Sequence, residues 1–321
     1  MKVFLTKLLL VFLLFYGMLL LLQILIDGKL QNSTSSTYLD WNLLMNGKIN
    51  APMVFLGNSR TEAHFDPEII EKNTGINSYN LGVAGSSLAI ELIRWNTYLA
   101  HNKPPKIVIQ NIDLYALTDK SIADKNQYLP YYDDAILFEK LQKIDRTVLY
   151  EKYIPMSKYR GYILKIKEEF SSSKNKEKSV IKIKGYQKHH STWNSDFAKM
   201  KNDMGAKKKN YDVSELNNQL LVLKKIIDDC NRIHAKLILV WSPQYYELNA
   251  FQEPTLNVMK NKMKQIALEN KNVIFWDFTK NQLNFDKKYF YNSFHLNDVG
   301  VALFCQQFSD SINLNVKKSI P

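Results

Sequence analysis

Short apolar runs alternate with helical patterns over most of the chain after residue 50, and this alternation constrains the fold more than any other feature. Strands are predicted at 53–57, 77–82, 106–114, 236–241 and 272–278. Helices are predicted from Pro67 and at 87–100, 214–233, 255–270 and 297–312. Continuous apolar strands joined by helices are typical of a parallel sheet covered on both faces. The sequence therefore predicts an α/β domain with a five-stranded parallel sheet in a flavodoxin-like three-layer sandwich.

Ahead of this domain lies an apolar run without charge, residues 8–26. A helix of about 20 apolar residues crosses the hydrocarbon core of a bilayer. Because no small-residue cleavage pattern follows, we expect a transmembrane anchor over residues 1–27, with a removed secretory signal as the alternative. Lys2 and Lys7 precede the run, so the positive-inside rule places the N-terminus in the cytoplasm and the rest of the chain outside.

The remaining chain divides into a polar linker, residues 28–50, and a domain over 51–321 that contains a large insert at 115–213, after the third strand. The insert is rich in Lys and Tyr, and it is too long for a simple loop. Open α/β sheets bind ligands at the carboxyl edge of their strands, where this insert begins. We therefore expect a lid or substrate-binding element, with a solvated basic excursion as the alternative.

The formal net charge of +12 suits an anionic membrane surface, an anionic polymer or nucleic acid as a partner. It is also what a Lys-rich composition alone would give. The outward orientation and the lack of a nucleic-acid motif exclude nucleic acid.

Cys230 and Cys305 are too few for a disulfide framework or a zinc site, and we expect two buried free thiols. His189 and His190 have no carboxylate or cysteine at ligand spacing, so no metal site is predicted.

Two turns after predicted strands and one loop before the last predicted helix carry residues suited to acyl chemistry. Gly-Asn-Ser-Arg at 57–60 follows the first strand, and a strand-to-helix turn there would place the Ser59 hydroxyl at the sheet edge. Gly85 follows the second strand, where its N–H could complete an oxyanion hole. His295 lies in a polar loop before the last helix and could act as a general base towards Ser59. A helix cap, a turn glycine and a structural histidine are the alternatives. The other histidines are predicted to be surface or lid residues: His64, His101, His189, His190 and His234.

Together these motifs resemble the SGNH (GDSL-like) hydrolase superfamily over residues 50–115 and 214–313. Ser59 matches the nucleophile of that family, and its backbone N–H matches an oxyanion donor. Asn80 and Gly85 match the Asn-x-x-x-x-Gly pattern of the oxyanion glycine, and His295 matches the base in the block before the last helix. The anchor and the Gly-Asn-Ser-Arg variant resemble membrane-anchored members of bacterial envelopes, many of which work beside membrane-bound O-acyltransferases.

The chain departs from the family pattern at two places. The acid three residues before the histidine is Asn292, which can orient an imidazole but cannot stabilise imidazolium by charge. In a serine protease, the same Asp-to-Asn change costs about 10⁴ in turnover. Asp277 is a possible substitute. The family's third block contributes an Asn to the oxyanion hole, and IQNIDLY at 109–115 offers Asn111 for that role, with Asp113 leaving the register ambiguous.

The resemblance implies an extracytoplasmic serine esterase or O-acyltransferase that acts on acyl esters of a cell-envelope polysaccharide or anionic polymer. Ser59 would carry the acyl group, His295 would move the proton, Asn292 would orient the imidazole, and Ser59, Gly85 and Asn111 would hold the oxyanion. No metal or organic cofactor is implied. A membrane-bound O-acyltransferase is a candidate partner. The alternative is a catalytically degenerate module that binds glycan or a membrane partner.

Overall fold

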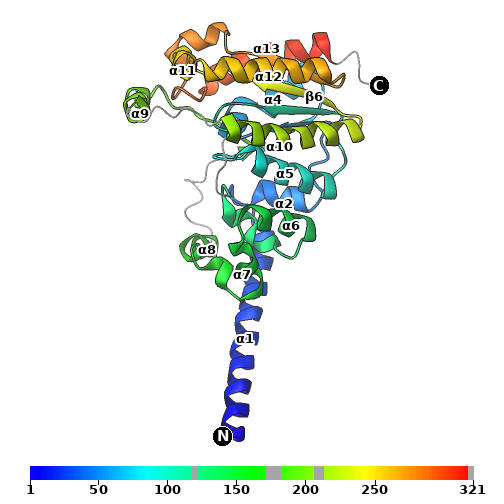
Figure 1. Cartoon of the computed structure of the whole chain (residues 1–321), viewed down its shortest axis with the longest axis vertical. Helices are drawn as coiled ribbons and strands as arrows, with labels where there is room; N and C mark the ends of the chain where they lie inside the picture. The colour runs from blue at the N-terminus through cyan, green and yellow to red at the C-terminus, as the bar shows by residue number, and fades with distance from the viewer. Residues whose placement is uncertain (118–121, 171–181, 206–212, 317–321) are drawn as a thin grey trace. The chain divides into compact units, whose positions relative to one another are not determined.

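The computed structural model describes residues 1–117, 122–170, 182–205 and 213–316, which form two compact units (Figure 1). One unit comprises Met1–Asn46 and Asp124–Ser179, and the other comprises Gly47–Ala123 and Val180–Pro321. The insert predicted over 115–213 is therefore shared between both units.

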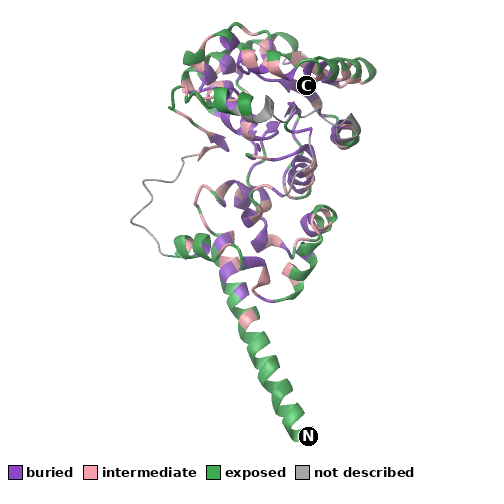
Figure 2. Ribbon diagram, turned by 60° about the vertical axis from the view of Figure 1, so that its left-hand side comes forward, coloured by how far each residue is buried: buried purple, intermediate pink, exposed green. Residues whose placement is uncertain are grey.

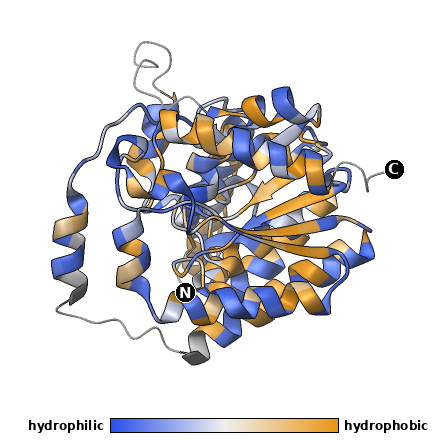
Figure 3. Cartoon of the chain, turned by 90° about the horizontal axis from the view of Figure 1, so that it is seen from above, coloured by the Kyte–Doolittle hydropathy of each residue, from blue (hydrophilic) through white to orange (hydrophobic). Residues whose placement is uncertain are grey.

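The second unit contains a five-stranded, fully parallel sheet with the order β2-β1-β3-β6-β7. This is the flavodoxin-like order, and it confirms the predicted fold class. Figure 3 shows the strands side by side and largely hydrophobic in colour. Strand burial on both faces explains the continuous apolar runs in the sequence. The strands are β1 (Met53–Leu56), β2 (Ser78–Asn80), β3 (Ile107–Asn111), β6 (Lys236–Trp241) and β7 (Val273–Asp277).

Helices cover the sheet on its two faces. On one face Asn313 donates to the backbone oxygen of Asn73, which joins the last helix to the end of α4. On the other face Asn96 donates to Asp229 and links α5 to α10. The first group is α3 (Ser59–His64), α4 (Pro67–Thr74) and α13 (Asp298–Asn315). The second group is α5 (Leu88–His101), α10 (Val213–Arg232) and α12 (Thr255–Glu269), and α11 (Tyr246–Gln252), η5 (Gln282–Phe285) and η6 (Lys287–Tyr289) lie in the connections.

The core beneath α13 is aromatic. The ring of Phe55 on β1 stacks on Phe65, with 5.0 Å between ring centroids, and Phe308 of α13 meets Phe65 edge-on at 5.2 Å. All three side chains are fully buried. Burying one such side chain contributes about 1.5–3 kcal/mol, so this cluster fixes α13 and the loop before it against β1.

Residues 182–205 of the insert also belong to the second unit. They form a hairpin of β4 (Lys182–Ile183) and β5 (Tyr186–Gln187), followed by α9 (Asp196–Gly205). The backbone oxygen of Lys184 accepts a 2.9 Å hydrogen bond from the N–H of Asn80, at the end of β2. Lys182 and Lys184 form ion pairs with Glu62 and Glu71, so these two lysines hold the hairpin in place. The lysines at 174, 176, 178, 207, 208 and 209 lie outside the described residues.

The first unit is helical and includes α1, which is long and apolar enough to cross a membrane. Figure 2 shows that the N-terminal part of α1 is exposed. The predicted linker 28–50 contains the end of α1 and a short helix, α2, in which Trp41 is fully buried. The elements are α1 (Lys2–Gln31), α2 (Leu39–Met45), η1 (Lys125–Gln127), η2 (Leu129–Tyr131), α6 (Ala135–Ile144), α7 (Thr147–Tyr153), η3 (Ser157–Tyr159) and α8 (Ile163–Phe170).

Candidate active site

Ser59 begins α3 directly after a sharp turn from β1. Gly57 has φ +146°, and a Cβ built on it would lie 2.0 Å from Oγ1 of Thr61, so only glycine fits there. Asn58 caps α3, because its Oδ1 accepts a hydrogen bond of 3.0 Å from the N–H of Arg60. The turn therefore holds Ser59 at the carboxyl edge of β1, next to β3, where the strand order reverses and flavodoxin-like sheets bind ligands.

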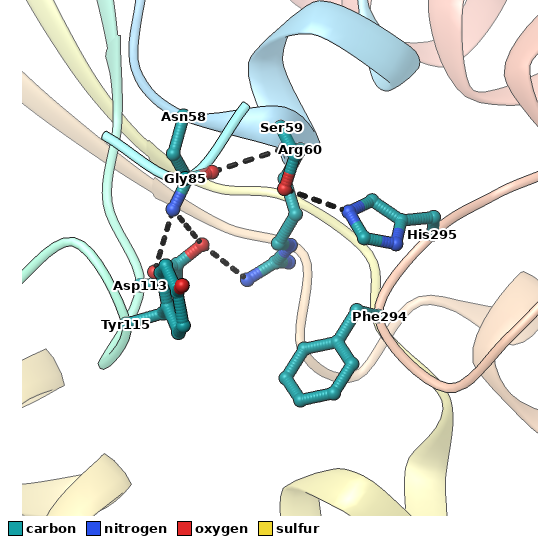
Figure 4. A pocket seen from close by; sticks show the side chains of 8 residues that line it. All are labelled: Asn58, Ser59, Arg60, Gly85, Asp113, Tyr115, Phe294 and His295. Atoms are coloured by element: carbon teal, nitrogen blue, oxygen red, sulfur yellow. Dashed lines mark hydrogen bonds and ion pairs between the residues drawn. The ribbon is translucent and has the colours of Figure 1, made fainter. Parts of the chain in front are cut away.

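His295 lies in the tight loop between η6 and α13. The loop is closed by a bridge between Phe290 and Leu296 and by a 3.1 Å bond from the N–H of Tyr291 to the oxygen of His295. The Nε2 atom of His295 lies 2.8 Å from Oγ of Ser59 (Figure 4). The structure thus brings together two residues that are 236 positions apart in the chain.

Asn292 determines which nitrogen of His295 carries the proton. Its Oδ1 accepts from the backbone N–H groups of Phe294 and His295, at 3.0 and 2.9 Å, which identifies that atom as the oxygen. The same oxygen lies 3.0 Å from Nδ1 of His295. Since an oxygen can only accept, Nδ1 must be the protonated nitrogen, and Nε2 keeps a lone pair towards the Ser59 hydroxyl. This is the tautomer that a general base for Ser59 requires.

The surroundings of His295 disfavour its charged form. Desolvation lowers the pKa of His295 to about 3, and the positive charge of Arg60 and the neighbouring His189 act in the same direction. The imidazole is therefore neutral at neutral pH. Asp277 does not supply the missing acid, because its carboxylate pairs with Lys260 at 2.8 Å and with Thr279.

A cavity of about 230 Å³ opens beside the Ser59–His295 pair (Figure 4). Gly85 enters its wall with φ +76°, a left-handed conformation that suits glycine. Asn111 is not among the lining residues. It is buried at the end of β3, and its Oδ1 accepts from the N–H of Ser242 at 3.3 Å. The lining residues are Asn58, Ser59, Arg60, Gly85, Asp113, Tyr115, Phe294 and His295.

A buried charged network that the sequence did not predict forms one side of this cavity. The guanidinium of Arg60 lies 3.5 Å from the carboxylate of Asp113 and also donates to Gln244 at 3.0 Å. Asn58 donates to both oxygens of Asp113, at 3.0 and 3.1 Å. Desolvation lowers the pKa of Arg60, and the charge of Asp113 opposes that shift. The pair balances two buried charges beside the Ser59–His295 contact, with Arg60 adjacent to Ser59 in the chain.

His64 is the clearest error of the sequence analysis, which placed it on the surface or in a lid. It is fully buried in α3, five residues after Ser59. Its Nε2 accepts from the N–H of Leu296 at 3.1 Å, and its Nδ1 lies 3.2 Å from the hydroxyl of Ser242. Desolvation lowers its pKa well below the ordinary value, so the ring is neutral. The sequence predicted a helix only from Pro67, and the partners of His64 lie in distant loops that no local pattern reveals.

His189 also differs from a surface residue, because it is half-buried against the loop of His295. Its ring stacks on Tyr291 with 4.6 Å between centroids, and Tyr291 stacks on the imidazole of His295 at 5.2 Å with nearly parallel planes. The N–H of Asn194 donates to the oxygen of Tyr291 at 2.9 Å. The segment after the β4–β5 hairpin therefore supports the loop of His295 from outside. Desolvation lowers the pKa of His189.

The geometry defines a three-layer α/β protein with a serine–histidine pair and a cavity at the carboxyl edge of its sheet. Within the described ranges, no group of three or more His, Cys, Asp or Glu could hold a metal ion.

No protein-family model and no curated protein matches the chain. Among solved structures, it is similar to a family two carbohydrate esterase from Clostridium thermocellum in complex with cellohexaose, with 10% sequence identity and a TM-score of 0.36. It is also similar to an acetyl xylan esterase from the rumen bacterium Butyrivibrio proteoclasticus, with 10% identity and a TM-score of 0.33. Each comparison covers 81% of this chain and 62% of the other, so the chain spans less than two thirds of either protein.

Proposed function

We propose that this chain is a membrane-anchored, extracytoplasmic serine esterase or O-acyltransferase of the SGNH type, which acts on acyl esters of a cell-envelope polysaccharide. The observation that carries the proposal is the 2.8 Å contact between Oγ of Ser59 and Nε2 of His295, with Asn292 holding the imidazole in the required tautomer. The contact opens on a cavity large enough for a short acyl group.

In this mechanism Ser59 attacks the ester carbonyl while Nε2 of His295 takes the hydroxyl proton. The backbone N–H groups of Ser59 and Gly85 stabilise the oxyanion, since both residues line the cavity. The protonated His295 then gives its proton to the departing alcohol, which leaves an acyl group on Ser59. Water as the second acceptor gives hydrolysis, and a sugar hydroxyl gives transfer. A membrane-bound O-acyltransferase is the partner that we propose for the transfer reaction.

Arg60 has a second role in the proposed mechanism. Its buried positive charge lies next to the site where the oxyanion forms, and a fixed charge in a desolvated site stabilises a transition state strongly. The same charge lowers the pKa of His295, so the site favours oxyanion formation at the expense of a stable imidazolium.

A catalytically degenerate module that binds glycan is the second candidate. It is favoured by Asn292, which provides no negative charge to a histidine whose pKa is about 3. A fluorophosphonate probe distinguishes the two functions, because it reacts only with an activated serine. We expect the full chain in detergent to be labelled at Ser59, and Ser59→Ala to abolish the labelling. Ser311→Ala, at a half-buried serine of α13 outside the cavity lining, is the matched control. A folded wild-type chain without any label would favour the binding module.

A further inference from the structure

The first unit exposes apolar side chains on helices outside α1. Two of them, Ile136 and Ile144, lie on α6, and the others lie in the segment 147–170, which contains α7, η3 and α8 and is called the collar below. The exposed fractions in the collar range from 39% to 77%. A water-soluble surface rarely gathers so many large apolar groups, and such a patch marks an interaction site. The exposed apolar residues of the collar are Leu149, Tyr150, Tyr153, Ile154, Ile163, Leu164 and Phe170.

The collar is attached to α1 by buried polar contacts. Gln23 accepts a hydrogen bond of 2.7 Å from the N–H of Met156. Asp27 pairs with Lys158 at 2.8 Å and accepts from the hydroxyl of Tyr159. These contacts fix the orientation of the collar on α1, so the two form one rigid structure. A secretory signal that is cut away would leave Lys158 buried without its carboxylate.

The contacts also show which part of α1 the collar lies beside. The hydroxyl of Tyr16 donates to the backbone oxygen of Tyr153 at 3.1 Å. Tyr16 precedes Asp27 by about 16 Å of helix axis. The part of the collar around Tyr153 therefore lies beside the apolar part of α1, whereas Glu169 of α8 accepts a 2.7 Å hydrogen bond from Ser33, just beyond the end of α1. A bilayer that surrounds α1 up to Tyr16 must reach the exposed face of the collar.

The composition of the collar matches a lipid–water interface. Tyr150 and Tyr153 are amphipathic rings of the kind that gather at membrane interfaces. Arg160, Lys165 and Lys167 are exposed on the same segment and can reach anionic headgroups. α1 before Gln23 is exposed over most of its length, which fits a span of about 30 Å.

We propose that the collar inserts into the interface of the bilayer that α1 crosses, with its apolar and tyrosine side chains among the acyl chains and its basic residues at anionic lipid headgroups. The first unit is then held at the membrane surface by the collar as well as by α1. The proposal is independent of the chemistry at Ser59.

Fluorescence of the full chain in lipid nanodiscs tests the proposal. In a Cys230→Ala/Cys305→Ala background, Tyr150→Cys, Ile154→Cys and Leu164→Cys each carry an environment-sensitive label. Leu268→Cys is the matched control, since Leu268 is 88% exposed on α12 of the other unit. In nanodiscs that contain phosphatidylglycerol and no second protein, we expect blue-shifted emission from the collar labels and quenching by lipids with a doxyl group near the headgroup. Emission like that of the Leu268 label would overturn the proposal and assign the collar to a protein partner.

Native mass spectrometry gives a second measurement on a chain without labels. We expect the wild-type chain to retain bound phosphatidylglycerol. The variant Arg160→Gln/Lys165→Gln/Lys167→Gln should retain severalfold less of this lipid. Lys224→Gln/Lys262→Gln/Lys264→Gln, with the same charge change in the second unit, should retain as much as the wild type. Equal loss in both triple variants, or in neither, would contradict the headgroup contact.

Discussion

His64 accepts a hydrogen bond from the backbone N–H of Leu296, at 3.1 Å, and so ties the helix that begins at Ser59 to the loop that carries His295. The segments that carry Ser59 and His295 are therefore held together by a third, buried side chain. The contact explains how a loop on the sheet edge can keep the 2.8 Å distance between Ser59 and His295.

Replacing His64 should lower activity more than stability alone explains. His64→Leu leaves the buried N–H of Leu296 without an acceptor, which costs about 1–3 kcal/mol, and frees the loop of His295 to move. We expect kcat on an acetyl ester to fall tenfold or more with little change in KM. Ser309→Ala is the control, because it removes a buried 2.7 Å hydrogen bond in α13 without contacting the loop. Equal losses of kcat in the two variants would show that His64 acts through stability only.

Asn292→Asp should supply the acid that the SGNH sequence pattern has at this position. An Asp keeps the acceptor oxygen for Nδ1 and adds a negative charge that favours imidazolium, so the pKa of His295 should rise from about 3. Because the base is active only when unprotonated, the acid limb of kcat/KM should move to higher pH while the plateau rises, by less than the ~10⁴ of a serine protease. Profiles between about pH 4 and pH 8 measure both effects. Asn281→Asp, which alters a comparable cap away from the site, is the control. Coincident profiles for wild type and Asn292→Asp would argue against His295 as the base.

The cavity predicts a preference for short acyl groups. Its volume of about 230 Å³ is below the ~300–1,000 Å³ of typical small-molecule sites, and Phe294 forms part of its wall. We expect kcat/KM to be at least tenfold higher for an acetyl than for an octanoyl ester. Phe294→Ala should reduce this ratio, whereas Phe285→Ala, at an exposed ring outside the lining, should leave it unchanged. A wild-type enzyme that prefers octanoyl esters would contradict the assignment of this cavity to the acyl group.

Glu91 predicts a loss of stability as the pH rises from about 4.5 to about 8. Burial raises its pKa from 4.5 to about 8, and it accepts a hydrogen bond of 2.6 Å from Gln110. Between pH 4.5 and about pH 8, the Glu91 carboxyl is ionised in the unfolded chain and still protonated in the folded chain. The stabilisation is therefore complete below about pH 4.5 and is lost as the pH rises towards about 8. Glu91→Gln should flatten the dependence of Tm on pH in this window, while Glu269→Gln, at an exposed carboxylate, should not. Parallel curves for wild type and Glu91→Gln would refute the assignment.

The fold was predictable because its strands are buried on both faces, which leaves continuous apolar runs at each strand. The predicted run 236–241 coincides with β6, and the run 106–114 extends past the end of β3 at Asn111. The extra residues of that run include Ile112 and Leu114, which are buried without being in the strand. Burial of the side chains therefore determines the length of each apolar run in the sequence, and backbone hydrogen bonding determines where each strand ends.

The site was predictable only where local structure positions the residue. Ser59 follows a strand, and His295 precedes a helix, so both left a sequence signal. The burial of His64 and the pairing of Asp113 with Arg60 left none, because they depend on residues that are distant in the chain. The helices of 124–170 were missed although α6 buries Leu137, Phe138 and Leu141 at helical spacing and contacts α7.

The proposed mechanism requires a covalent acyl intermediate on Ser59, which rapid-quench mass spectrometry of the full chain with an acetyl ester can detect. We expect one acetyl group on the peptide that contains Ser59 and none in Ser59→Ala. We also expect slow acetylation in His295→Ala if this mechanism operates. Turnover of the ester without any acetyl group on Ser59, or an unchanged rate in Ser59→Ala, would contradict it.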